Sequence, residues 1–152
     1  MNNELPTTKD IEELVAFSTI LYDKNFTISK TPLNKINNDP LDIFQITDYN
    51  DVVLEFFELA SKPCWSDYKY SSKNVSDMIG NKNLINNASL EQIITMLTYC
   101  VRGERFCDGF WASMIEDRYI KLLLERLIEL NKKSDKGVSI SVLINALIIG
   151  PK

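Results

Sequence analysis

The chain has 152 residues, the length of one ordinary domain, which is enough to bury a hydrophobic core without disulfides or metals. Hydrophobic residues make up 45% and charged residues 25%, which excludes a disordered or fibrous protein. The net charge of −4 disfavours a protein that holds duplex DNA directly, because neutralising phosphates requires a basic face. Histidine is absent, which removes the commonest general base, the commonest zinc ligand and every Ser/His or Cys/His nucleophile pair.

The sequence begins M-N-N-E-L-P, with no basic segment followed by an apolar one, so we predict no signal peptide. The odd number of cysteines (Cys64, Cys100 and Cys107) indicates free thiols in a reducing compartment. The longest apolar run, V-L-I-N-A-L-I-I from Val142, is too short to span a bilayer. We therefore expect a cytoplasmic protein without a membrane partner.

The first predicted helix covers residues 7–22, where threonines can cap the start and Ile11, Leu14, Val15 and Leu21 share one stripe. Asp23–Thr47 contains two prolines and the turn-prone N-N-D-P, which predicts a long loop with at most a weak strand or hairpin. A second helix is expected from Asp48, with Pro63 as its stop. Its apolar set is Val52, Val53, Phe56, Phe57 and Ala60.

An aromatic cluster that includes Trp65 and Tyr68 comes next, and S-S-K-N-V-S-D-M-I-G predicts a short helix that ends at Gly80. Residues 81–87 are rich in asparagine, which indicates a turn. The spacing S-L-E-Q from Ser89 is that of a capping box, and the apolar periodicity after it predicts a third strong helix to about Val101 or Arg102.

Gly103 is suited to the left-handed position that closes this helix, and Asp108 to the N-cap of the next. Residues 109–132 form either one helix or two with a break near Asp117. The apolar segment Gly137–Lys152 has an ambiguous pattern that fits a strand in its first half and a buried helix in its second. We thus predict a mainly α, compact single-domain bundle of about five helices over residues 1–152.

Residues 98–113, T-Y-C-V-R-G-E-R-F-C-D-G-F-W-A-S, concentrate specialised side chains. The structural interpretation is a corner between helices in which Arg102 and Arg105 pair with carboxylates or carbonyls, Phe106 fills the core and Trp111 packs inward. The functional interpretation is a site in which both guanidiniums, a helix start and the indole hold a carboxylate or phosphate. The sequence leaves both open.

The candidate binding residues are the arginines, acids and tryptophan of this segment and two earlier aromatics: Arg102, Glu104, Arg105, Asp108, Trp111, Trp65 and Tyr68. Stacking of single-stranded bases on the aromatics is disfavoured because lysines and arginines are not interleaved with aromatics over the chain as a whole. The paired carboxylates read as helix caps, and the cysteines are spaced as buried free thiols. We therefore predict no catalytic residue, no metal site and no cofactor.

The run R-G-E-R-F-C-D-G-F-W, followed by L-L-L-E-R-L-I-E-L, resembles the bacterial and phage-associated family called domain of unknown function 6508. In that family an E-R-F-x-x-G-type corner joins two C-terminal helices. The resemblance covers residues 93–131 and leaves Gly137–Lys152 outside the pattern. It implies no activity, because the function of the family is not established.

These observations favour a non-enzymatic interaction protein from a phage or mobile element that binds a host or phage protein, such as a nucleic-acid-handling one. The alternative is a small-ligand or nucleotide binder that uses the corner formed by Arg102, Arg105 and Trp111. An enzyme that relies on carboxylates or Cys107 ranks third. The apolar C-terminal segment also allows self-association, since such a segment must be buried somewhere.

Overall fold

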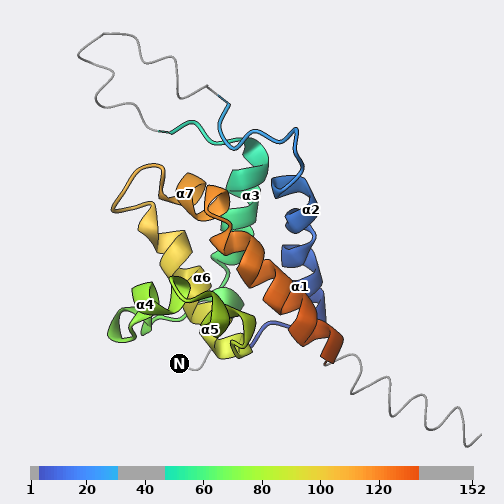
Figure 1. The fold of residues 1–152 in the computed structure, drawn as a ribbon, viewed down its shortest axis with the longest axis vertical. Coiled ribbons are helices and arrows are strands. Elements are labelled where there is room, and N and C mark those ends of the chain that lie inside the picture. Colours follow the sequence, from blue (N-terminus) through green and yellow to red (C-terminus); the bar gives the residue numbers. More distant parts are fainter. Residues whose placement is uncertain (1–3, 31–46, 134–152) are drawn as a thin grey trace, which may run out of the picture.

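The computed structural model describes residues 4–30 and 47–133. In these residues the protein is mainly helical, with eight α-helices and no β-strand. The helices pack in a compact arrangement (Figure 1). The predicted mainly α fold is confirmed, although the helices outnumber the expected five. They are α1 (Thr8–Val15), α2 (Phe17–Leu21), α3 (Asp51–Ala60), α4 (Val75–Ile79), α5 (Lys82–Asn86), α6 (Leu90–Gly103), α7 (Phe110–Glu116) and a C-terminal helix over residues 119–133.

The helix predicted over residues 7–22 is divided into α1 and α2. The start of α1 is a capping box, in which Thr7 Oγ1 accepts a hydrogen bond from Asp10 N and Asp10 Oδ2 accepts one from Thr7 N. The division falls at Ala16, whose backbone keeps a right-handed conformation with φ −58° and ψ −27°. The predicted stripe holds across the break, since Ile11, Leu14 and Leu21 are all buried.

An isolated antiparallel bridge between Ser29 and Tyr49 ties the segment after α2 to the segment before α3. Because the bridge keeps the chain extended at Asp48, α3 begins at Asp51 and takes Asn50 as its N-cap, so the predicted start at Asp48 is wrong. Residues 31–46 of the loop predicted over Asp23–Thr47, with its weak strand or hairpin, lie outside the described residues, as does the segment Gly137–Lys152.

Two 3-10 turns, η2 (Pro63–Trp65) and η3 (Tyr70–Ser72), lead from α3 into α4, which ends at Gly80 as predicted. The prediction of a turn over residues 81–87 is wrong, because α5 forms there. The Asn81 side chain accepts a hydrogen bond from Leu84 N at 3.1 Å, and the fully buried Ile85 anchors this short helix to the core.

Helix α6 is the centre of the molecule and packs against α3, α4, α7 and both 3-10 turns. Its predicted capping box is present, with Ser89 Oγ accepting from Gln92 N and Gln92 Oε1 accepting from Ser89 N. Its inward face is buried without interruption from Ile93 to Thr98 and again at Cys100.

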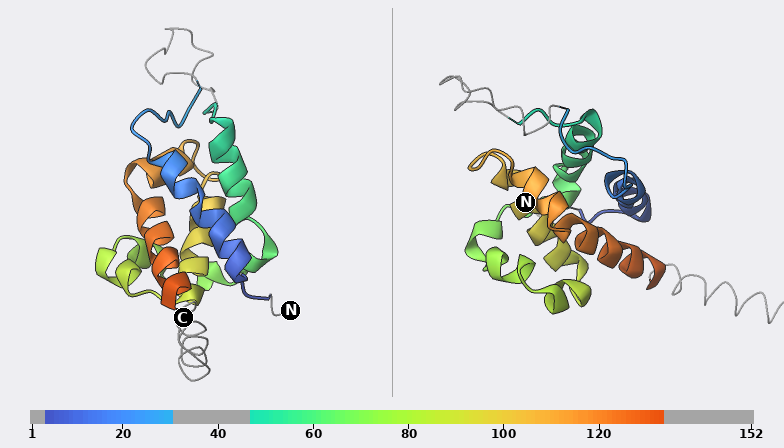
Figure 2. Two further views of the ribbon diagram at one scale, coloured as in Figure 1. Left: turned by 90° about the vertical axis from the view of Figure 1, so that its right-hand side faces the viewer. Right: turned by 45° about the horizontal axis from the view of Figure 1, so that its top comes forward.

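The C-terminal helix lies beside α1 and α2, as the views in Figures 1 and 2 agree. Tyr22 makes this contact specific, because its hydroxyl donates to Ile115 O and accepts from Lys121 N, each at 3.0 Å. Arg118, with φ of 67°, separates this helix from α7, which settles the open question over residues 109–132 in favour of two helices. Within residues 4–30 and 47–133, no helix has the length and apolarity needed to cross a membrane.

Candidate functional site

Two glycines, Gly103 and Gly109, shape the corner between α6 and α7, each for a different physical reason. Gly103 ends α6 in ordinary backbone geometry, but a Cβ at this position would lie 2.4 Å from the ring of Phe110. The left-handed residue is Gly109, with φ of 85°. The prediction that Gly103 is the left-handed helix terminator is therefore wrong, because its lack of a side chain serves the close approach of the Phe110 ring.

Glu104 fixes the start of α7. Its carboxylate accepts hydrogen bonds from Gly109 N and Trp111 N, both at 3.0 Å, and from the Tyr49 hydroxyl at 2.7 Å. These bonds satisfy backbone donors that are otherwise orphaned at a helix start. The donors at the start of α7 are thus already occupied by a carboxylate of the chain itself, and Asp108 is not the N-cap that the sequence predicts.

Asp108 instead binds the segment that leads into α3. Its two carboxylate oxygens accept from Thr47 N at 3.0 and 3.1 Å, and Oδ2 accepts from the Thr47 hydroxyl at 2.6 Å. The bond from the hydroxyl holds the pKa of Asp108 below its usual value. Asp108 and Glu104 together tie residues 104–109, the corner loop, to residues more than fifty positions earlier.

The corner loop exposes Phe106, 83% of whose surface is accessible to solvent. The prediction that this ring fills the core is wrong, because the junction of the helices is already filled by two other aromatic contacts. Phe110 packs edge-on against Tyr99 at 5.5 Å between ring centroids, and Trp111 stacks on Phe57 at 4.3 Å.

Trp111 packs inward as predicted, but one part of it stays at the surface. Its ring lies parallel to that of Phe57 within 5°, and its Nε1 donates to Val101 O at 3.1 Å. The ring forms part of a surface cavity of about 380 Å³ between α3 and the corner, which we call the α3–α7 groove. Its lining residues are Leu54, Phe57, Glu58, Ser61, Val101, Glu104, Arg105 and Trp111.

A smaller cavity of about 120 Å³ adjoins the groove and shares Ser61, Val101 and Arg105 with it. We call it the arginine cavity, because both Arg102 and Arg105 line it. Its remaining lining residues are Ala60, Ser66, Tyr68 and Thr98.

The predicted pairing of the two arginines with carboxylates or helix-end carbonyls is not found. Within the described part of the chain, neither guanidinium forms an ion pair or a side-chain hydrogen bond. The guanidinium of Arg102 lies over the rings of Tyr70 and Tyr68, at 5.3 and 6.0 Å from their centroids. Both positive charges therefore remain available to a ligand.

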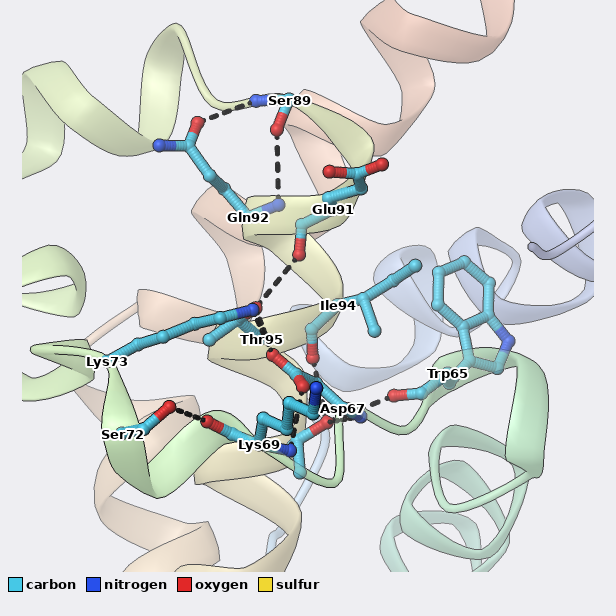
Figure 3. Close-up of polar contacts among 11 residues, drawn as sticks. Trp65, Asp67, Lys69, Ser72, Lys73, Ser89, Glu91, Gln92, Ile94 and Thr95 are labelled. Carbon is cyan, nitrogen blue, oxygen red and sulfur yellow. Dashed lines mark hydrogen bonds and ion pairs between the residues drawn. The ribbon is translucent and has the colours of Figure 1, made fainter. Parts of the chain in front are cut away.

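A third cavity, of about 410 Å³, lies beyond Ser66 and Tyr68, which it shares with the arginine cavity. Its wall includes Asp67, whose carboxylate accepts from Lys73 Nζ and Thr95 Oγ1, both at 2.7 Å (Figure 3). Burial acts to raise the pKa of Asp67, but these bonds outweigh it and lower the pKa. Because Asp67 and Lys73 in its wall are paired with each other, we regard this cavity as structural.

The comparisons with known proteins place the chain in a family. A family model described as a family of unknown function, DUF6508, matches residues 6–133. The chain belongs to the DUF6508 family. The match is far longer than the stretch on which the resemblance in the sequence rests, and it contains every residue of the α3–α7 groove and of the arginine cavity. No match was found among curated proteins or among solved structures.

The structure of this DUF6508 protein brings most of the predicted site residues together. Five of them line the groove or the arginine cavity: Tyr68, Arg102, Glu104, Arg105 and Trp111. Asp108 lines neither cavity, and its carboxylate holds the corner loop in place through its hydrogen bonds with Thr47. Trp65 is fully buried, so it offers no surface for a ligand, and its Nε1 has no hydrogen-bond partner among the residues that the structure describes.

Helix α3 supplies Leu54, Glu58 and Ser61 to the groove, and none of the three is among the predicted site residues. A signal for one of these was present. Leu54 is a large apolar residue that lies off the apolar stripe of its helix, and it is 44% exposed in the structure. An apolar side chain on the polar face of an amphipathic helix indicates a contact outside the core of the protein.

All three cysteines are free: Cys100 is buried, Cys64 is half-buried and Cys107 is exposed, the last contrary to prediction. Burial raises the pKa of the Cys100 thiol. Across residues 4–30 and 47–133, no three side chains of the types that ligate metals are grouped in a way that could hold an ion.

Proposed function

We propose that this DUF6508 protein acts by binding another protein through the corner loop and the α3–α7 groove. The observation that carries the proposal is the exposure of Phe106, at 83%, on a loop that is fixed rather than loose. Burying such a ring in an interface contributes about 1.5–3 kcal/mol. Aromatic residues and arginine are the types enriched in the cores of protein interfaces.

The fixed geometry of the loop supports this proposal. Glu104 and Asp108 together accept six hydrogen bonds from Thr47, Tyr49, Gly109 and Trp111. A side chain displayed on an already ordered loop loses little conformational entropy when it binds. The apolar surface beside the loop, to which Leu54 and Trp111 contribute, extends the contact.

The partner that we expect is a host or phage protein. The net charge of −4 favours one with a basic surface, such as a protein that handles nucleic acids, because complementary charge speeds association. The three free thiols support a reducing compartment such as the cytoplasm.

The proposal is tested by comparing the full-length protein with its Phe106→Ser variant. Each is immobilised, exposed to lysate of the source cell, and its bound proteins are quantified by mass spectrometry. We expect one protein to be retained by the wild type and lost with Phe106→Ser. With that protein purified, Phe106→Ser should weaken binding roughly thirtyfold, the effect of an interface hot spot of about 2 kcal/mol.

Ile20→Ser provides the matched control, because Ile20 lies on α2, outside the groove, and is 45% exposed. It removes an exposed apolar side chain of similar size and should leave binding unchanged. Retention of the same proteins by the wild type and by Phe106→Ser, with both variants folded, would refute the proposed binding surface.

A second candidate function is small-ligand or nucleotide binding at Arg102, Arg105 and Trp111. It is favoured because neither guanidinium forms an ion pair within residues 4–30 and 47–133. It predicts a rise in Tm with ATP that adenosine does not produce, since only ATP offers phosphate to the arginines. One face of the Trp111 ring is covered by Phe57, which leaves limited room for a base to stack. We therefore rank this function below protein binding.

A further inference from the structure

The arginine cavity differs in charge from the cavities on either side of it. The groove on one side contains Glu58 and Glu104, and the cavity on the other contains Glu4, Asp67 and Glu91. No acidic residue lines the arginine cavity itself, although the chain as a whole carries a net charge of −4. A locally positive cavity within an acidic protein attracts a negatively charged group.

The two guanidiniums are also held in a way that suits an anion. Arg102 lies in the last turn of α6 and Arg105 in the corner loop that follows, and no carboxylate within the described residues forms an ion pair with either of them. The guanidinium of Arg102 lies against the Tyr70 and Tyr68 rings. An anion in the cavity that both side chains line would accept hydrogen bonds from both guanidiniums.

The volume of the cavity limits the size of this anion. At about 120 Å³ it has room for a single small group, on the order of four water molecules. A whole nucleotide needs a pocket of several hundred Å³. Phosphate sites commonly use the amides of a helix start, but those of α7 are occupied by Glu104. A carboxylate, which a guanidinium binds through two parallel hydrogen bonds, therefore fits best.

We propose that the arginine cavity binds an aspartate or glutamate side chain of the protein partner, next to an apolar side chain that occupies the α3–α7 groove. This inference rests on the proposed function and specifies the chemistry of the partner's binding segment. The two subsites share Ser61, Val101 and Arg105, so neighbouring residues of one segment can reach both. The basic character expected of the partner governs long-range attraction, whereas the cavity selects a local carboxylate.

The test uses a blocked pentapeptide, Ala-Asp-Leu-Asp-Ala, and its uncharged twin, Ala-Asn-Leu-Asn-Ala, as probes. Each is titrated into the full-length, ¹⁵N-labelled protein, and the Nε–Hε signals of the arginines are followed by NMR. We expect the Arg102 and Arg105 signals to shift with the aspartate peptide, and its affinity to exceed that of the twin roughly tenfold. This advantage should shrink as salt is added.

Arg102→Gln and Arg105→Gln should each remove the preference for the aspartate peptide. Arg118→Gln is the control, because it deletes the same charge at an exposed position that lines neither cavity. Equal affinity for the two peptides, or no shift at either arginine, would overturn the inference. Tighter binding of inorganic phosphate than of the aspartate peptide would do the same and would identify a phosphate site.

Binding of the captured partner to the variants distinguishes a failure of this inference from a failure of the proposed function. If Phe106→Ser abolishes capture while both glutamine variants bind the partner as tightly as the wild type, the binding surface stands and the carboxylate site is wrong. If Phe106→Ser has no effect, the proposed function itself fails.

Discussion

At the residue scale, Gly103 shows how a single missing side chain can join two helices. The ring of Phe110 occupies the space that a Cβ would take, and the same ring packs against Tyr99 of α6. The contact places the start of α7 directly against the end of α6. The position of Trp111, and hence of one wall of the α3–α7 groove, depends on this close approach.

Gly103→Ala should lower the free energy of unfolding. The new methyl group forces the packed Phe110 ring to move, which costs about 1–3 kcal/mol, and the gain of about 1 kcal/mol that alanine has over glycine in a helix offsets only part of this cost. Urea denaturation measures the difference. Gly80→Ala is the control, since the nearest atom to its Cβ is 3.4 Å away, and it should change stability by less than about 1 kcal/mol.

The roles of the residues in the corner could not be predicted from the sequence. Gly103 and Asp108 carry the usual local signals for a helix end and a helix start, yet Phe110 and Thr47 decide their roles. Glu104 caps α7 from outside the helix, at a spacing that no capping-box pattern contains. Such contacts arise from tertiary packing, so the sequence predicts the presence of a corner but not which side chain does what in it.

At the element scale, Asp67 fastens the irregular segment between α3 and α4 to α6. Its carboxylate accepts hydrogen bonds from Thr95 of α6, from Lys73 and from Lys69 N (Figure 3). Its own N–H donates to Thr98 Oγ1. Two buried threonines on an otherwise apolar helix face are therefore satisfied by this one residue and its neighbours.

Asp67→Asn should lower the free energy of unfolding at pH 7 by about 1–3 kcal/mol, because Lys73 and Thr95 lose a charged acceptor. The folded-state pKa of Asp67 is lowered, so its contribution is present above the unfolded value near 4 and is lost as the pH falls through the folded pKa. Urea titrations at several pH values should show the difference between wild type and variant narrowing in acid.

Asp117→Asn is the control for this measurement, because Asp117 is exposed. It should leave the acid dependence of stability close to that of the wild type. A difference between Asp67→Asn and wild type that stays constant from neutral to acidic pH would show that the carboxylate of Asp67 is not ionised in the way described.

The success of sequence reasoning for each element depended on how local its signals are. Helix α6 was predicted closely because its capping box and apolar periodicity both lie within the segment itself. Helix α5 was missed, since five residues carry too little periodicity and Asn81 can start a turn as well as a helix. The predicted start of α3 differs from the observed one because the bridge between Tyr49 and Ser29 joins distant segments, which no local pattern indicates.

At the scale of the whole molecule, Tyr22 connects the N-terminal helices α1 and α2 with α7 and the C-terminal helix. Its hydroxyl bonds to Ile115 O at the end of α7 and to Lys121 N in the first turn of the C-terminal helix. Burial raises the pKa of this phenol, which therefore stays protonated and able to donate. The mainly α class was predictable from periodicity alone, but this closure between residues almost a hundred positions apart was not.

Tyr22→Phe should lower the free energy of unfolding by about 1–2 kcal/mol, because the backbone amide of Lys121 loses its partner at a part-buried position. Chemical denaturation should show a lower midpoint with an unchanged slope. Tyr68→Phe makes the same chemical change at a side chain that is 61% exposed and should have little effect. Equal stability of the two variants would contradict the bracing role of Tyr22.

The two tryptophans lie in contrasting surroundings, since Trp65 is sealed in the core and Trp111 borders the α3–α7 groove. Their fluorescence therefore reports two separate events. With Trp65 replaced by phenylalanine, emission comes from the indole beside the groove and follows occupancy of the surface without an attached dye. With Trp111 replaced, the remaining emission follows unfolding of the core. The protein thus carries intrinsic optical probes of both its stability and its proposed binding surface.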